Sequence, residues 1–103
     1  MNAVERLWRG LAGRDWRAVH SQFGANAVVE WPHTGARMDA EEYVGRHRER
    51  AGGDAAVVVS RVVTEGRNVA VEARVGEAYC AGFYDLHDGL IVGAVEYWVG
   101  ETA

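Results

Sequence analysis

The 103-residue sequence contains no lysine, one cysteine and one proline. Its formal net charge of −4 lacks the basic excess that favours nucleic-acid phosphates, so we expect no nucleic-acid partner. Cys80 has no second cysteine for an internal disulfide, which is typical of a reducing compartment. No apolar run approaches the ~20 residues of a membrane span, and Glu5, Arg6 and Arg9 interrupt the N-terminus where a signal peptide would be apolar. We therefore predict a cytoplasmic protein with no membrane partner.

The composition that remains is that of an ordinary globular chain. Apolar residues make up 49% of the sequence and charged residues 25%, and there is no internal repeat or low-complexity segment. At this length one hydrophobic core is expected, because chains split into several domains only at larger sizes. The sequence predicts a single domain over residues 1–103.

The first 24 residues predict two short helices. Asn2 followed by Glu5 is a capping box that begins the first helix, and Gly13 ends it. Asp15 is a cap for the second helix. Apolar or aromatic side chains recur at helical spacing in this second segment, at Trp16, Val19, His20 and Phe23.

A strand and a third helix follow. Residues 27–31 read as a strand that stops at Pro32, because proline lacks the donor that a central strand needs. Asp39 begins the third helix, which places Tyr43, Val44 and His47 on one side, and Gly52-Gly53 ends it.

The second half of the chain predicts a β-meander. Residues 56–64 are rich in valine, and residues 69–75 alternate between apolar and other side chains. A two-residue turn at Gly76-Glu77 would place Ala73 opposite Cys80 and Val71 opposite Gly82.

The last hairpin, residues 79–99, carries the residue of greatest interest. Asp88-Gly89 predicts a turn, and a three-residue loop would pair Leu86 with Leu90 and Cys80 with Glu96. One face then consists of mostly small residues around a single acid: Cys80, Gly82, Tyr84, Val92, Ala94, Glu96 and Trp98. A slip of one residue would instead put Glu96 on the surface, so its direction stays open at this point.

The opposite face of this sheet is apolar as well. It would carry Ile91, Val95, Tyr97 and Val99. Because the helices can cover only one face, we expect a homodimer through the outer sheet face. The fold class predicted from this pattern is α+β, with helices packed against a curved, mostly antiparallel sheet.

Several of these segments resemble a known family. Residues 15–23 and 27–35, with Asp88-Gly89-Leu90-Ile91 and Glu96-Tyr97-Trp98, resemble the nuclear transport factor 2-like (NTF2-like) superfamily, in particular its SnoaL-like branch. The resemblance implies a cone-shaped α+β barrel with three N-terminal helices in the concave face of the sheet, an apolar pocket between them and, usually, a homodimer. It implies no single activity, because this scaffold hosts isomerases, cyclases, epoxide hydrolases and non-catalytic binding modules.

The acids that the resemblance makes catalytic are absent here. The general base of ketosteroid isomerases corresponds to Trp31, and their oxyanion-hole acid lies near Gly82. In SnoaL-like cyclases an aspartate follows the last strand, where this chain has Val99 and Gly100. The sequence therefore does not match the known isomerase site. A proton-transfer reaction that uses other residues is still compatible with it.

The remaining candidates form one hypothesis with a competing alternative. In the hypothesis Glu96 is a buried general acid or base, Tyr84 or His33 polarises a substrate oxygen, and the substrate is a small apolar organic molecule. Its pocket would be lined by Trp31, Trp98, His20, His47, Gly82 and Ala94. In the alternative the same aromatic and histidine side chains fill a core, and the protein is a non-catalytic binding or dimeric interaction module. The four scattered histidines have no metal-ligand spacing, so we expect neither a metal nor a cofactor.

Overall fold

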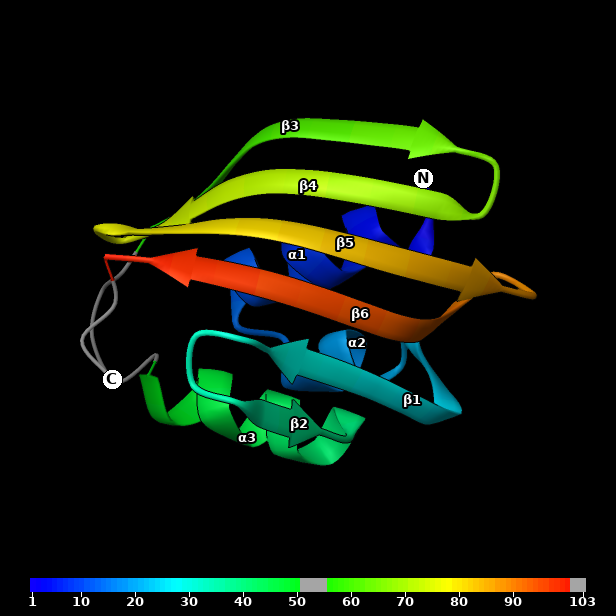
Figure 1. Ribbon diagram of the computed structural model, residues 1–103, viewed down its shortest axis with the longest axis horizontal. Helices are drawn as coiled ribbons and strands as arrows, with labels where there is room; N and C mark the ends of the chain where they lie inside the picture. The colour runs from blue at the N-terminus through cyan, green and yellow to red at the C-terminus, as the bar shows by residue number, and fades with distance from the viewer. Residues whose placement is uncertain (51–55, 101–103) are drawn as a thin grey trace.

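A computed structural model describes residues 1–50 and 56–100 of the chain. Its elements are α1 (Ala3–Gly13), α2 (Trp16–His20), β1 (Phe23–Trp31), β2 (Ala36–Met38), α3 (Ala40–Arg50), β3 (Val57–Glu65), β4 (Asn68–Val75), β5 (Ala78–His87) and β6 (Leu90–Val99). The strands form one six-stranded sheet in the order β2-β1-β6-β5-β4-β3, and the three helices cover one of its faces (Figure 1). The predicted α+β class is therefore confirmed.

The predicted barrel is wrong, because the sheet is not closed and β2 and β3 form its two edges. The three predicted N-terminal helices are confirmed in part: α1 and α2 precede the sheet, and α3 follows the β1–β2 hairpin. The sequence analysis also missed β2, whose three residues are too few to show an alternating pattern.

The helices begin where their caps were predicted. Asn2 and Glu5 exchange side-chain hydrogen bonds with each other's backbone N–H, which completes the capping box of α1. Asp15 accepts from the backbone N–H of Ala18, and Asp39 accepts from that of Glu42. The predicted end of the third helix at Gly52-Gly53 lies outside the described residues.

Helix α2 is shorter than its apolar pattern implies. It ends at His20, and the chain enters β1 at Phe23, so His20 is exposed while Val19 and Phe23 are buried. The placement of His20 on a core-facing stripe was wrong, because that stripe assumed another turn of helix.

The β4–β5 pair has the register that was predicted. Ala73 lies opposite Cys80 and Val71 opposite Gly82. This register puts the apolar side chains of β4 on the face that the helices cover, since alternate residues of a strand share a face.

The β5–β6 pair differs from its predicted register by two residues. Asp88 and Gly89 both have positive φ and form a two-residue turn, so His87 pairs with Leu90. A β-bulge at Val92 adds the second shift and places Gly82, not Cys80, opposite Glu96. The bulge also reverses two side chains: Ile91 is fully buried, and Val92 is 42% exposed. A shift of two residues leaves each side chain on the same side of the sheet, so residues 94–98 lie on the faces that were predicted for them.

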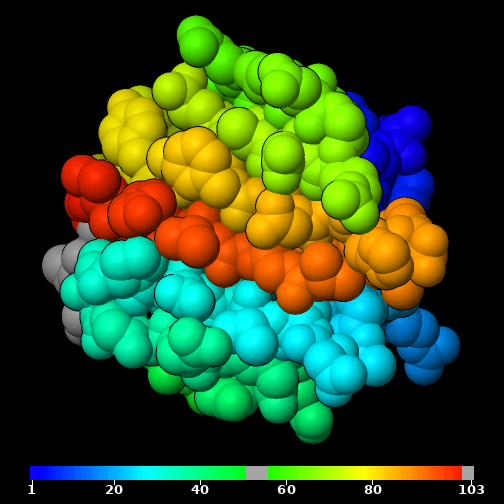
Figure 2. Space-filling view, turned by 45° about the vertical axis from the view of Figure 1, so that its right-hand side comes forward, coloured from blue at the N-terminus to red at the C-terminus, as the bar shows by residue number. Residues whose placement is uncertain are grey.

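Strand β6 lies at the centre of the sheet, antiparallel to β5 and parallel to β1. The parallel pairing brings β1, from the N-terminal half, beside the last strand, and it aligns Val29 with Ala94. The side chains of β1, β6, β5 and β4 succeed one another in bands across the molecule in Figure 2. Among the described helices, none is both long and apolar enough to cross a membrane.

Candidate functional site

Glu96 lies in the interior between the sheet and the helices. It comes from the middle of β6, points to the face that the helices cover, and has no exposed surface. The inward direction that the sequence left open is thus the observed one. A buried carboxyl group is costly unless polar partners surround it, so its hydrogen bonds decide what it can do.

Four aromatic side chains donate hydrogen bonds to this carboxyl group. Trp31 Nε1 and Trp98 Nε1 donate to Oε1, over 3.0 Å and 3.4 Å. The hydroxyls of Tyr43 and Tyr84 donate to Oε2, over 2.9 Å and 2.5 Å. Both oxygens therefore accept two hydrogen bonds each, which uses their acceptor capacity.

Gly82 makes room for one of these donors. A Cβ built on Gly82 would lie 2.7 Å from the ring of Tyr84, two residues along the same face. The Tyr84 ring therefore covers Gly82 and directs its hydroxyl at Glu96, on the strand opposite. Trp8 Nε1 donates in turn to the Tyr84 hydroxyl over 3.1 Å, which ties α1 to this cluster.

The electrostatics follow from burial. Desolvation raises the pKa of Glu96, although the hydrogen bonds from Tyr84, Trp31, Tyr43 and Trp98 act in the opposite direction. Burial, followed by the charge of Glu96, raises the pKa of Tyr43 and Tyr84 well above the ordinary value. The two phenols therefore stay neutral and act as donors.

The outer side of this aromatic cluster is formed by α3. His47 is buried, with its ring centroid 4.6 Å from that of Tyr43 and 5.9 Å from that of Trp31. Burial, followed by the charge of Arg50, lowers the pKa of His47 to about 3, so this histidine is neutral at physiological pH. Its Nε2 atom is buried and has no hydrogen-bond partner among the described residues.

A small cavity lies beside His47. It measures about 30 Å³ and is lined by Leu11, Arg14, Trp16, His47, Arg50, Val57 and Val75. This space is about the size of one water molecule. We call this cavity the mouth. It lies between the aromatic cluster, which consists of Trp31, Tyr43, His47, Tyr84 and Trp98, and the strand ends that carry Val57 of β3 and Val75 of β4.

The structure brings some predicted site residues together and separates others. Glu96, Tyr84, Trp31, Trp98 and His47 form one continuous cluster. Predicted pocket residues Gly82 and Ala94 are buried beneath Tyr84 and in the core, respectively.

Two predicted histidines lie elsewhere. His20 is exposed at the end of α2, so its predicted place in the pocket lining is wrong. His33 is exposed in the turn after β1, with its ring 5.8 Å from that of Trp31, and Glu96 takes its hydrogen bonds from other residues.

The sequence analysis did not include three members of the cluster, Tyr43, Trp8 and Arg50, among the site residues. Tyr43, Arg46, His47 and Arg50 follow the i, i+3, i+4, i+7 spacing of one helix face, so the pattern contained the signal. Trp8 had no such signal, since its partner Tyr84 is 76 residues away.

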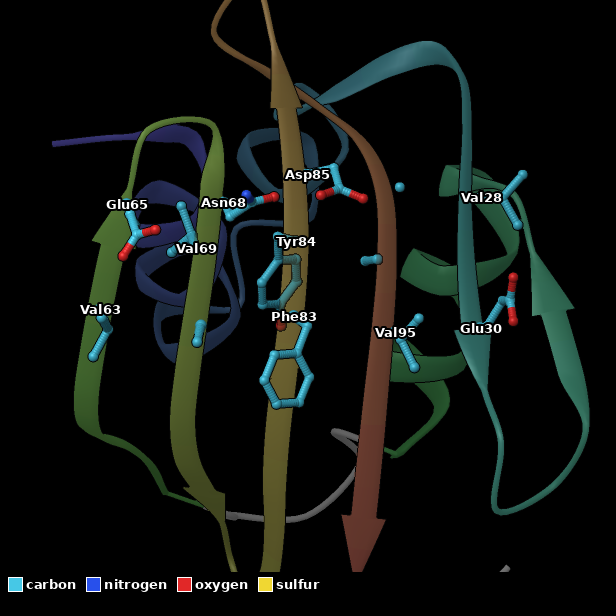
Figure 3. A pocket seen from close by; sticks show the side chains of 13 residues that line it. Val28, Glu30, Val63, Glu65, Asn68, Val69, Phe83, Tyr84, Asp85 and Val95 are labelled. Carbon is cyan, nitrogen blue, oxygen red and sulfur yellow. The ribbon is translucent and has the colours of Figure 1, made fainter.

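The outer face of the sheet holds a second, open groove of about 540 Å³ (Figure 3). Phe83 lies at its centre between Val63 and Val95, and Glu65 and Asp85 lie toward one end. Further along the same face are exposed apolar side chains: Val58, Tyr79, Tyr97 and Val99. Within residues 1–50 and 56–100, no three His, Cys, Asp or Glu side chains converge in a way that could hold a metal ion.

Comparison with solved structures identifies the fold. No family model matches the sequence, and no curated protein matches it significantly. The chain is similar to a candidate ketosteroid isomerase from Kribbella flavida (23% identity, TM-score 0.79), over 98% of this chain and 78% of that one. It is also similar to an NTF2-like protein of unknown function from Burkholderia xenovorans (20% identity, TM-score 0.83), over 98% and 83% of the two chains. A third similar structure is a candidate polyketide cyclase from Streptomyces antibioticus (19% identity, TM-score 0.81), with 93% and 88% covered. The chain therefore has the fold of the NTF2-like superfamily, which includes the SnoaL-like proteins.

Proposed function

We propose that this chain is a SnoaL-like binding protein that takes a small, largely apolar organic molecule at the mouth, with the aromatic cluster as the floor of the site. The cavity itself has room for about one water molecule, so the ligand would enter by displacing the Arg50 side chain that lines it. The observation that carries the proposal is His47, whose Nε2 is buried beside a cavity and has no described partner. Buried polar atoms are nearly always satisfied, so an atom of this kind is an available contact for a ligand. Trp31 and Trp98 supply flat apolar surface behind it.

In this proposal Glu96 is a positioning residue. Its four donors leave no free lone pair for a substrate proton, and none of the cavities described above is lined by it. The carboxyl group fixes the orientation of both indoles and both phenols, which makes the floor rigid. This arrangement favours the non-catalytic alternative over the acid–base alternative.

Substitutions at the mouth test the proposal. Val57 is a half-buried lining residue, and the neighbouring Val58 is 54% exposed and belongs to the other face. Native mass spectrometry of the purified wild type is expected to detect a co-purifying small molecule. Val57→Trp should lose it by filling the mouth, and the control Val58→Trp should retain it. A wild type that carries no molecule, and that no member of a small-molecule library stabilises in thermal melts, would refute the proposal.

A second candidate function is general acid–base catalysis without a cofactor, of the isomerase, cyclase or hydrolase type. The observation in its favour is the raised pKa of Glu96 next to the short hydrogen bond from Tyr84. A carboxyl group whose pKa is raised by burial binds a proton more readily than an ordinary glutamate and can exchange it with a substrate if the cluster opens. Turnover of an identified ligand that Glu96→Gln abolishes, with binding retained, would establish this function over the first.

We also propose that the outer face pairs with a second copy of the chain. The face combines an apolar centre at Phe83 with further exposed apolar side chains at Tyr79, Tyr97 and Val99. A second copy packed on this face would remove these side chains from water. Light scattering should give a dimer mass for the wild type.

The matched variants for the dimer are Phe83→Asp, at the centre of the groove, and Ala12→Asp, on the exposed side of α1. Phe83→Asp is expected to be monomeric, because it buries an unpaired charge in an apolar contact. Ala12→Asp should remain dimeric. A wild type that is monomeric at every concentration would contradict this proposal.

A further inference from the structure

The guanidinium group of Arg50 lies over two indole rings at the mouth. Its Cζ atom is 5.2 Å from the ring centroid of Trp31 and 5.1 Å from that of Trp98. The same two indoles donate their N–H groups to Glu96 Oε1 on the other side. The rings therefore turn their polar edges toward the buried carboxyl group and their faces toward the cation.

This arrangement is suited to holding a positive charge. The face of an indole ring is negative and attracts cations more strongly than other aromatic rings do. When an indole N–H donates to a carboxylate, the hydrogen bond draws electron density toward the ring, and the negative charge adds its own attraction. Burial leaves little water to screen these interactions.

Two independent features indicate that this place can admit another molecule. The cavity of about 30 Å³ is lined by both Arg50 and His47. The His47 Nε2 atom is buried and unpartnered among the described residues, and its ring centroid is 5.8 Å from that of Trp98. A ligand that displaced the Arg50 side chain would gain this cavity, the space of the side chain and a hydrogen-bond partner.

We propose that the faces of Trp31 and Trp98 form a recognition site for a small organic cation with a spread charge, such as a guanidinium or methylated ammonium group, and that Arg50 is its resident occupant. This inference rests on the proposed function, since it names the ligand class of the same mouth. Arg50 acts as an internal competitor at a high effective concentration. A ligand must therefore combine its charge with apolar contacts or with a bond to His47 in order to replace Arg50.

Removal of the competitor tests the inference. The indole N–H resonances of Trp31 and Trp98 would be followed by NMR during titration with low-millimolar guanidinium chloride, with urea as the uncharged planar control. In Arg50→Ala we expect saturable shifts with guanidinium and at least about tenfold weaker binding of urea. The wild type should bind guanidinium about tenfold or more weakly than Arg50→Ala. Arg48→Ala, on the exposed side of the same helix, should behave as the wild type.

Two results would overturn the inference: equal binding of guanidinium and urea by Arg50→Ala, or no saturable binding by that variant. If Arg50→Ala does not fold, Arg50→Met keeps the apolar stem without the charge, and the same criteria apply to it. The outcome is distinguishable from failure of the proposed function. A neutral co-purifying molecule lost in Val57→Trp would leave binding at the mouth intact while excluding its preference for cations.

Discussion

Replacement of His47 by phenylalanine is expected to remove part of the acid sensitivity of the fold. The side chain is buried among Tyr43, Trp31 and Trp98, and Arg50 adds a positive charge nearby. Burial and that charge lower its pKa from the ordinary 6.5 to about 3 in the folded chain. Between these two values the unfolded chain binds the proton and the folded chain does not, so stability is lost as the pH falls.

The magnitude follows from the two pKa values. Between about pH 7 and about pH 5 this single group should cost the wild type about 2 kcal/mol of unfolding free energy. Phenylalanine has a similar size and ring shape, so the core should accept it, and it carries no polar atom that needs a partner.

The assay is urea unfolding at a series of pH values. The difference in unfolding free energy between His47→Phe and wild type should grow in favour of the variant as the pH falls. His20→Phe replaces an exposed histidine and is the control, for which we expect the wild-type dependence. If the unfolding free energies of His47→Phe and wild type change in parallel with pH over this range, the claim that His47 is buried and neutral is wrong.

Substitutions at three positions test the cluster around Glu96. Glu96→Leu should lower the unfolding free energy by on the order of 5 kcal/mol or more in chemical unfolding, because it leaves four buried donors without an acceptor. The isosteric Glu96→Gln should lower it by about 1–3 kcal/mol. Equal losses for the two variants would contradict the hydrogen-bond network. Gly82→Ala should lower the unfolding free energy by about 1–3 kcal/mol, because the new methyl group meets the Tyr84 ring, and a neutral result would mean that the ring does not lie there. Tyr84→Phe should cost about 1–3 kcal/mol, because Trp8 loses its acceptor and Glu96 a donor, and an unchanged melting temperature would argue against this pair of bonds.

The sequence predicted the alternation of the sheet better than its pairing. Turn chemistry at Gly76 fixed the β4–β5 register, because a two-residue turn permits one alignment. At Asp88-Gly89 the same reasoning missed both the shorter turn and the bulge at Val92. Bulges depend on how a strand bends over the core, which local composition does not encode. Glu96, whose direction the sequence left open, points inward because the two shifts together preserve the side-chain period.

The site was less predictable than the fold. The donors to Glu96 come from α3, β1, β5 and β6, and their convergence depends on the parallel β1–β6 pairing, which joins distant parts of the chain. Helical periodicity misplaced His20 because α2 ends at this residue, and tertiary packing rather than the local sequence sets that end. The same periodicity places Arg50 on the helix face that carries His47, so it could have predicted that Arg50 belongs to the site.

The central claim is that Glu96 is a buried carboxyl group held by aromatic donors at the floor of the site. NMR titration of its carboxyl carbon tests this claim most directly. The account predicts a pKa above the ordinary glutamate value in the wild type, because burial outweighs the hydrogen bonds, and a still higher pKa in Tyr84→Phe, because Tyr84 supplies the largest opposing effect. An ordinary pKa that does not change in Tyr84→Phe would contradict it and would mean that Glu96 is in contact with water.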